Sequence, residues 1–206
     1  MVKSIFGHID GATPIDDVSD LIPNIGTLPE LNEYEAENVL DAVIKHFINR
    51  PVMQEGIEFD YFWMLTVHKD MFGRVWKWAG KTRTKNLNIG VDSTQVEPQL
   101  IDVCKSIPYF KNPPDMSDIA YLHHRLVQIH PFTNGNGRWS RLVSNIYQIR
   151  FTGKFTDWPD DLIGTTSNTS SIRGEYIQSL KEADSGKYEK IIRLHEQFSK
   201  VMPDNM

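Results

Sequence analysis

Residues 130–141 read His130-Pro-Phe-Thr-Asn-Gly-Asn-Gly-Arg-Trp-Ser-Arg141, with two glycines, two asparagines and two arginines. Apolar residues recur at helical spacing on both sides of this stretch, so we expect one helix to end near His130 and another to begin near Asn136. The start of a helix exposes backbone N–H groups and the positive end of the helix dipole. The pattern therefore predicts a tight loop that leads into an electropositive helix start.

The residues around this helix start have the chemistry of an anion site. Gly135 and Gly137 carry no Cβ atom, so a ligand can approach the backbone closely. Arg138 and Arg141 are three positions apart and lie on nearly the same face of the first turns, where their guanidinium groups can bind phosphate oxygens. The side chain of Asn136 can donate to the same anion. Together these residues predict a phosphate-binding site.

His130 lies just before this site, and imidazole is well suited to accept a proton near neutral pH. Each feature also has an ordinary interpretation: a loop histidine, a Gly-Asn-Gly turn and two arginines on a solvated helix face. Phe132 is expected to be a core residue that anchors the loop. The phosphate site is favoured because a base, glycines, an amide and two arginines occur together within twelve residues.

The rest of the chain predicts an all-α fold in one domain, residues 31–200, that follows an irregular arm over residues 1–30. Asn32 is the expected cap and Pro51 the expected end of the first helix, and Ser117 is the expected cap of the fourth. Residues 82–91 alternate weakly and predict a short β-hairpin. Helices are expected near residues 32–50, 60–72, 100–107, 117–129, 136–147, 172–180 and 188–198.

Composition excludes several classes of protein. The chain has 206 residues, 40% of them hydrophobic and 24% charged, which are globular values. Cys104 is the one cysteine, so a disulfide-stapled secreted scaffold is excluded. The N-terminus lacks the apolar core of a signal peptide and no run is long enough to span a membrane, so we expect a cytoplasmic protein without a membrane partner.

Charge is unevenly distributed in this acidic chain, whose net charge is −5. The segment 69–85 holds six basic residues against Asp70, which indicates either a local anion site or a solvated face. A duplex nucleic acid partner is not expected, because such partners usually require a basic domain overall. His123 and His124 are adjacent on a helix and face apart, so we assign no structural zinc.

The stretch 130–141 resembles the signature of the Fic-domain family, His-x-Phe-x-(Asp/Glu)-Gly-Asn-Gly-Arg-x-x-Arg. Every fixed position matches except one, where Asn134 replaces the acid. The likeness extends over roughly residues 30–195 and includes three further segments. The arm, with Thr13-Pro-Ile-Asp and Leu21-Ile-Pro, is similar to a subgroup linked to mobile elements and called mobile mystery protein B. The three segments are Trp78-Ala-Gly-Lys-Thr-Arg83, Leu122-His-His-Arg-Leu-Val-Gln-Ile-His130 and Ala183-Asp-Ser-Gly-Lys-Tyr188.

The resemblance implies a Fic-type helical bundle that transfers AMP from ATP to a hydroxyl of a Ser, Thr or Tyr in a target protein. By position, the resemblance makes His130 the base and Arg138 the contact to the terminal phosphates, and with Asn136 these form the catalytic set. Arg141 would orient the nucleotide. Tyr176, with Arg173, either lines the base pocket or packs in the core. The nucleotide-binding set is then Gly135, Asn136, Gly137, Arg138, Arg141 and Tyr176.

The resemblance also implies a magnesium ion and a flap that holds the target. The acid of the signature holds Mg²⁺, and Asn134 would be a weaker ligand because an amide oxygen is neutral. The hairpin would bind the target by strand addition. Its residues are Lys85, Asn86, Leu87, Asn88 and Ile89.

Regulation and the reaction itself leave alternatives open. Glu37 could inhibit by pairing with Arg141, a separate antitoxin chain could do so in a toxin–antitoxin pair, or there is no inhibitor. Asn134 keeps two other functions open. One is an enzyme of this fold that transfers a different phosphate-containing group, and the other is a catalytically weak nucleotide- or partner-binding module.

Overall fold

The computed structural model describes residues 19–48, 59–159 and 171–202. It is mostly helical, which confirms the predicted fold class, and it carries one small antiparallel sheet of β1 and β2. The helices are α1 (Leu28–Val43), which continues into the π-helical turn η1 (Ile44–Ile48), α2 (Tyr61–Phe72), η2 (Ser93–Gln95), α3 (Val96–Ser106), η3 (Ile107–Tyr109), α4 (Met116–Ile129), α5 (Asn136–Thr152), α7 (Ser171–Ala183) and α8 (Glu189–Gln197), and the strands are β1 (Lys154–Thr156) and β2 (Ser199–Val201).

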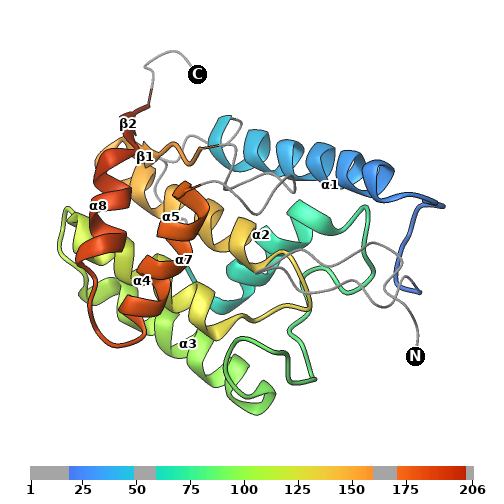
Figure 1. Ribbon diagram of the computed structural model, residues 1–206, viewed down its shortest axis with the longest axis horizontal. Coiled ribbons are helices and arrows are strands. Elements are labelled where there is room, and N and C mark those ends of the chain that lie inside the picture. The colour runs from blue at the N-terminus through green and yellow to red at the C-terminus, as the bar shows by residue number, and fades with distance from the viewer. Residues whose placement is uncertain (1–18, 49–58, 160–170, 203–206) are drawn as a thin grey trace.

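Helix α5 runs through the middle of the molecule and contacts α4 and α2, while α1 packs along α2 and α8 packs on α4 (Figure 1). The main core lies between these helices and is built on large side chains without solvent contact, among them Trp139, Phe132 and Tyr147. A second, smaller core fills the space between α4, α7 and α8. Its buried members are Ala120, Trp158, Tyr176, Ala183, Ile191 and Leu194.

The helix starts differ from the predicted caps at two positions. Thr27 caps α1, and its hydroxyl and the Glu30 carboxylate form a capping box, so Asn32 lies inside the helix. Asp115 rather than Ser117 caps α4, again with a reciprocal capping box. Both caps satisfy backbone N–H groups that the first turn of a helix leaves unpaired. The predicted end of the first helix at Pro51 lies outside the described residues.

The predicted β-hairpin at residues 82–91 is wrong. The segment is a loop, and the two strands of the described chain lie elsewhere, where Phe155 pairs with Lys200. The loop runs against the end of α4, because the backbone N–H of Arg83 donates to the carbonyl of Pro131 at 2.9 Å. Its polar groups are therefore used by α4 and by its own turns rather than by a second strand.

The division between arm and domain at residue 30 stays a prediction. Helix α1 begins two residues earlier, at Leu28, and the segment before it already contacts the domain: Leu21 forms a β-bridge with Trp76. None of the helices in the described part of the chain is both long enough and apolar enough to span a membrane.

Candidate active site

The loop between α4 and α5 is held by a buried aromatic anchor. Phe132 has no exposed surface, stacks on the His68 ring at a centroid distance of 3.6 Å and meets Trp139 edge-on at 4.9 Å. This confirms the prediction that Phe132 is a core residue. Because the anchor lies two residues after His130 and three before Gly135, both ends of the loop are fixed in space.

His130 is the residue that ends α4, and its backbone is left-handed, with φ 52°. This conformation is uncommon for a residue other than glycine, and it turns the chain sharply out of the helix. The imidazole is 8% exposed, and it hydrogen bonds to the backbone carbonyl of Val127. Burial lowers the pKa of His130 to about 4. At neutral pH the ring is therefore uncharged, with one nitrogen bonded to the protein and the other able to accept a proton.

Asn136 has a different task from the predicted anion contact. Its Oδ1 accepts from the N–H of Phe132 and its Nδ2 donates to the carbonyl of Phe132, both at 2.8 Å. The side chain is 2% exposed, so it closes the loop internally. We therefore correct its role: the Asn136 amide braces the loop, and only its backbone N–H faces the space before the helix.

The two glycines of the loop also differ from each other. Gly135 has φ 77°, and a Cβ atom there would lie 2.5 Å from the ring of Phe72, so packing against α2 requires glycine at this position. A Cβ atom on Gly137 would meet nothing nearer than 3.6 Å, at the guanidinium of Arg141. Ligand access therefore explains Gly137 but is not needed to explain Gly135.

Arg138 lies on the first turn of α5 and is already paired. Its Nη2 is 2.6 Å from Oε2 of Glu35 on α1, and its guanidinium lies 4.7 Å from the centre of the Phe72 ring. Glu35 is almost fully buried and also accepts from Trp76 Nε1 at 2.7 Å. A carboxylate thus occupies the position at Arg138 where the sequence predicted phosphate.

Arg141, one turn further along α5, is 8% exposed and lies against Tyr176, with 5.8 Å between its guanidinium carbon and the ring centre. Burial lowers its pKa, and the neighbouring charges of Arg138 and Arg173 lower it further. The positive charges of Arg138 and Arg173 therefore lie close enough to repel that of Arg141. An anion bound between these guanidinium groups would reduce the repulsion. The pairing of Glu37 with Arg141, one of the three alternatives for regulation, is not formed, because Glu37 is exposed and Arg141 contacts Tyr176.

The first turn of α5 completes this anion site. The first helical hydrogen bond of α5 runs from the N–H of Trp139 to the carbonyl of Gly135 at 2.9 Å. The backbone N–H groups of residues 136–138 precede that bond, so they are the groups that a helix start offers to a ligand.

Asn134 fits a magnesium ion poorly. Its side-chain oxygen accepts from the N–H of Gly135 at 2.6 Å, and its backbone oxygen lies 3.0 Å from Nε2 of His68. The described residues contain no group of three His, Cys, Asp or Glu side chains that could hold a metal ion. Since Mg²⁺ is usually bound through at least one carboxylate, these residues do not form a magnesium site of their own.

His68 and Arg83 are, like Glu35, residues of this region for which the sequence predicted no role at the site. Nδ1 of His68 accepts from the N–H of Gly80 at 3.0 Å, so its Nε2 carries the proton donated to Asn134. Arg83 is 5% exposed and its Nε donates to the carbonyl of His130 at 2.7 Å. The local sequence does not reveal either role, because His68 pairs with Asn134, 66 positions away, and Arg83 with His130, 47 positions away.

Arg83 fastens the predicted flap to the end of α4. Besides His130, its guanidinium donates to the carbonyl of Lys85, the first residue of the flap, at 2.9 Å and to that of Val91, two residues beyond the end of the flap. Gly90 packs closely against His130, because a Cβ atom on Gly90 would lie 2.6 Å from Cβ of His130. The residues between are mostly exposed: Lys85, Asn86, Asn88 and Ile89 face solvent, and Leu87 is half-buried.

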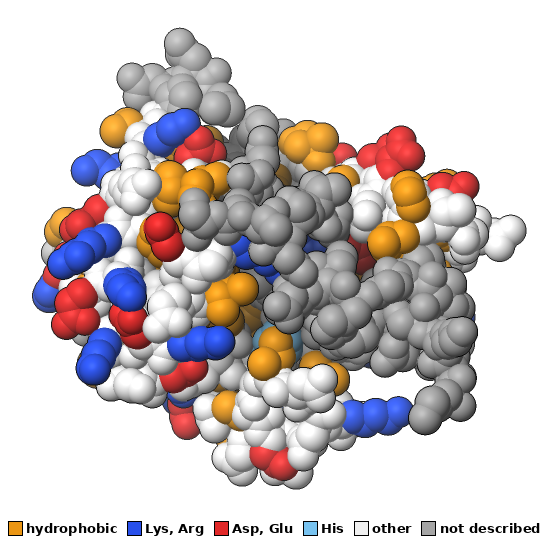
Figure 2. Space-filling view, viewed as in Figure 1, with side chains coloured by type: hydrophobic (Ala, Val, Ile, Leu, Met, Phe, Trp, Pro, Cys, Tyr) orange, Lys and Arg blue, Asp and Glu red, His pale blue; other side chains and the backbone are white. Residues whose placement is uncertain are grey.

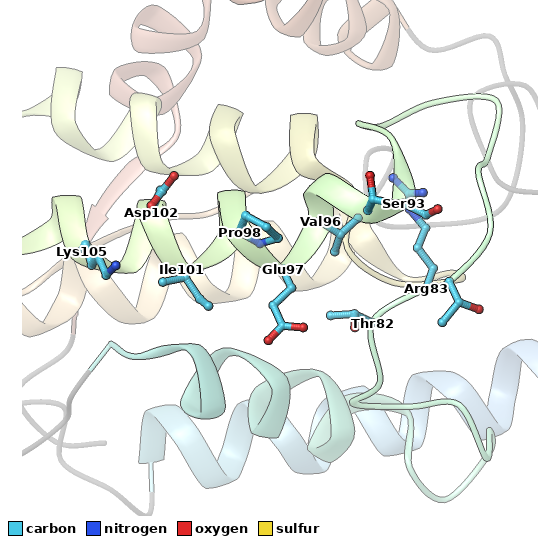
Figure 3. A pocket seen from close by; sticks show the side chains of 11 residues that line it. Thr82, Arg83, Ser93, Val96, Glu97, Pro98, Ile101, Asp102 and Lys105 are labelled. Atoms are coloured by element: carbon cyan, nitrogen blue, oxygen red, sulfur yellow. The ribbon is translucent and has the colours of Figure 1, made fainter.

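The basic segment 69–85 does not form one anion site. Arg83 uses its guanidinium on backbone carbonyls, Arg74 pairs with Asp41 at 2.6 Å, and Lys77 donates to the carbonyl of Ser19. An open groove of about 750 Å³ lies between residues 82–84 and α3 (Figure 3). Its described lining includes Glu97, Asp102 and Lys105 but none of the residues predicted to bind nucleotide.

Acid is expected to destabilise this protein well above pH 4. Burial lowers the pKa of His68 and of His195 to about 3, whereas an unfolded chain binds these protons near pH 6.5. Between these values the unfolded state holds more protons, so the free energy of unfolding falls as pH falls, by about 1.4 kcal/mol per pH unit for each histidine. Urea titrations at pH 7.5, 6 and 5 measure this slope. A free energy of unfolding that is unchanged between pH 7 and 5 contradicts it, and His68→Gln should remove one histidine's share.

Comparison with known proteins finds a family match in the middle of the chain. Residues 58–148 match the model of the Fic/DOC family. The chain is 28% identical over 163 residues to "Protein adenylyltransferase fic-1" of Caenorhabditis elegans, a match that covers 75% of the chain and 30% of that protein. The chain thus spans about a third or less of the length of these curated relatives.

Two solved structures share the fold. The N-terminal Fic domain of a putative cell filamentation protein from Bartonella quintana has a TM-score of 0.68 at 19% identity, covering 98% of this chain and 94% of that one. The BepC protein of Bartonella tribocorum, solved with bound AMPPNP, has a TM-score of 0.63 at 18% identity, covering 85% and 89%. On the face in Figure 2, basic side chains and a histidine are visible near the centre.

Proposed function

We propose that this chain, whose residues 58–148 match the model of the Fic/DOC family, is a protein adenylyltransferase that transfers AMP from ATP to a hydroxyl side chain of a target protein. One observation carries the proposal. An uncharged His130, with a nitrogen able to accept a proton, ends one helix directly before the start of another that bears Arg138 and Arg141. The curated relatives are named protein adenylyltransferases, which supports the same reaction.

In the proposed step, the target hydroxyl attacks the α-phosphorus of ATP. A new O–P bond forms, the bond from that phosphorus to the bridging oxygen breaks, and pyrophosphate leaves with the electron pair. His130 takes the hydroxyl proton. Transfer of this kind depends mainly on positioning and on neutralising charge, and the backbone N–H groups at the start of α5 with Arg138 and Arg141 supply both.

Binding of ATP would also improve His130 as a base. Its pKa of about 4 in the free protein makes it a weak acceptor, because burial opposes the charged imidazolium. The negative phosphates would stabilise that charge and raise the pKa toward neutrality. The proton acceptor is thus strengthened only when the nucleotide is in place.

Magnesium enters the proposal only as a companion of the nucleotide. Asn134 is neutral and its oxygen is already bonded to Gly135, so no step is assigned to a metal held by the protein. The charge of the leaving pyrophosphate is then carried by the guanidinium groups and the helix start.

The target protein is proposed to lie along the segment 85–89, where an extended peptide would pair with backbone groups. Both ends of this segment are fixed, one by Arg83 and the other by the contact of Gly90 with His130. A hydroxyl presented there would lie beside the base. A role as the toxin of a mobile element, an antitoxin partner, the mobile mystery protein B subgroup and a cytoplasmic location stay predictions from the sequence.

Incubating the protein and a cell lysate with ATP labelled at the α- or the γ-phosphate tests the reaction. Label from the α-position on protein supports adenylyl transfer. Label from the γ-position instead indicates transfer of a phosphate group, which Asn134 in place of the acid would favour. Protein that stays unlabelled in both experiments indicates a nucleotide- or partner-binding module.

Glu35→Gln is expected to tighten ATP binding about fivefold to thirtyfold. The Glu35 carboxylate competes with phosphate for Arg138, and a charge-assisted hydrogen bond of this kind is worth about 1.5–3 kcal/mol, part of which the nucleotide would regain. Glutamine keeps an oxygen for Trp76 Nε1 and loses only the charge. Calorimetric titration with ATP, and transfer from α-labelled ATP, measure the gain.

Glu37→Gln is the matched control, because it removes the same charge from an exposed position two residues along α1. It should leave ATP affinity unchanged. Equal gains in the two variants would mean that general acidity of α1, rather than the ion pair with Arg138, opposes the nucleotide.

A further inference from the structure

A chain of buried polar side chains leads from Arg141 through the smaller core to the sheet. Nε2 of His123 lies 3.1 Å from the Tyr176 hydroxyl, and Nδ1 of His123 lies 3.0 Å from Nε2 of His195. Nδ1 of His195 in turn lies 2.8 Å from Oγ1 of Thr156 on β1. His123 and His195 are without solvent contact, so each ring must satisfy its nitrogens inside this chain.

The donor at the Arg141 end favours one direction along this chain of hydrogen bonds. A guanidinium can only donate, so the hydroxyl of Tyr176 beside Arg141 accepts and has its own proton left for His123. Because Nε2 of His123 then accepts, its Nδ1 carries the ring proton. The same argument makes Nε2 of His195 an acceptor and its Nδ1 a donor to Thr156.

The hydrogen bonds at the Thr156 end of this series run in the same direction. The Thr156 hydroxyl donates to Oε1 of Gln148 at 3.0 Å, so it has a lone pair for His195. Thr156 is itself fixed, since its backbone N–H and carbonyl both bond to the side-chain amide of Asn145. Burial, which lowers the pKa of both histidines, keeps the two rings uncharged and each limited to one proton.

We propose that His123 and His195 are positioning residues for the guanidinium of Arg141. They act through Tyr176: the two rings orient its hydroxyl proton away from α5, so that its lone pairs face Arg141. Reversing the chain would aim an N–H of His123 at Tyr176 and leave the Tyr176 proton to compete with Arg141. This inference rests on the proposed function, because it assigns Arg141 to the phosphates of ATP.

The first test is spectroscopic and needs no variant. Nitrogen-15 NMR of the histidine rings distinguishes the two neutral tautomers, and at pH 7 both His123 and His195 are expected to carry the proton on Nδ1. Single variants, His123→Asn and His195→Asn, assign the signals. Finding either ring with its proton on Nε2 would overturn the proposed direction.

The second test changes Thr156, the member of the hydrogen-bonded series farthest from Arg141. Thr156→Val has nearly the same shape but cannot accept from His195, and we expect it to weaken ATP binding by about threefold to tenfold, the worth of one ordinary hydrogen bond. Thr156→Ser keeps the hydroxyl and should restore both ATP affinity and the Nδ1 tautomers. ATP affinity that is unchanged in Thr156→Val overturns the proposal.

A change in the same core that is only apolar provides the control. Ile191→Val removes one buried methylene group from the smaller core and leaves every polar atom of the chain in place. It should lower thermal stability without changing ATP affinity. If Ile191→Val weakens ATP binding as much as Thr156→Val does, the histidines are merely structural and the proposal fails.

These outcomes separate the inference from the proposed function. A wild-type protein that binds no ATP would overturn the proposed function. It would also overturn the role of the hydrogen-bonded histidines in nucleotide binding, even if both rings show the expected tautomer. If ATP binds but His123 and His195 carry their protons on Nε2, the proposed function stands and the proposed role of the two histidines fails.

Discussion

His130→Ala is expected to lower the rate of AMP transfer by about 10²–10⁴-fold while ATP still binds, because a positioned general base contributes about that much. The structure explains why the two effects separate. The groups assigned to the phosphates are on α5, whereas His130 ends α4. Transfer with labelled ATP and calorimetric binding, measured on one preparation, give both values.

His130→Asn is the matched variant for this experiment. The backbone of His130 is left-handed, and asparagine adopts that conformation more readily than alanine does, so the end of α4 should keep its shape. Asparagine cannot accept the hydroxyl proton at neutral pH. Both variants should therefore lose transfer alike, and a transfer rate near that of the wild type in either one would remove His130 from the mechanism.

The pH dependence of the wild type provides a second measurement of the same role. Burial lowers the pKa of His130 to about 4. The value of kcat/KM for ATP reports the free protein, so protonation of His130 should not lower it between pH 7 and 5.5. The value of kcat reports the nucleotide complex, where phosphate raises the pKa, so its acid limb should lie at higher pH. An acid limb of kcat/KM near pH 6.5 would mean that His130 is not buried in solution.

The sequence was sufficient for the presence and order of the helices, which depend on neighbours in the chain, although two of their caps were misplaced. Helical spacing of apolar residues placed the helices, and the aromatic residue two positions after His130 was identified as an anchor because a loop between two buried helices needs one. The predicted hairpin failed for the opposite reason. Its weak alternation did not reveal that Arg83 would use its guanidinium on carbonyls at the end of α4, more than 40 positions away.

The roles inside the signature were predicted less well than its position. Gly135 was assigned to ligand access, yet the ring of Phe72, 63 positions earlier, is what excludes a Cβ there. Arg138 was assigned to phosphate, and its partner Glu35 could not be recognised because 103 residues separate the two. When a residue could contact either a ligand or a distant part of the protein, the sequence alone does not show which of the two contacts is made.

Arg138→Ala is expected to weaken ATP binding roughly tenfold to hundredfold and AMP binding much less, since its proposed contact is to the terminal phosphates and a charge-assisted contact is worth about 1.5–3 kcal/mol. The structure adds a second effect. Among the described residues, removing the guanidinium leaves the buried Glu35 with Trp76 Nε1 as its partner, and a buried carboxylate without a cation costs stability and repels phosphate. The single variant therefore mixes a lost contact with a new repulsion.

The double variant Glu35→Gln/Arg138→Ala separates the two effects. It removes the unpaired charge, so the free energy of unfolding should recover toward that of Glu35→Gln alone, while ATP affinity should recover only by the share due to repulsion. Affinities for ATP and AMP in the wild type, the two single variants and the double variant form a cycle whose coupling energy belongs to the ion pair. If the double variant binds ATP as well as Glu35→Gln does, then Arg138 contributes nothing to nucleotide binding beyond neutralising Glu35, and the terminal phosphates must be held by Arg141 and the backbone of α5.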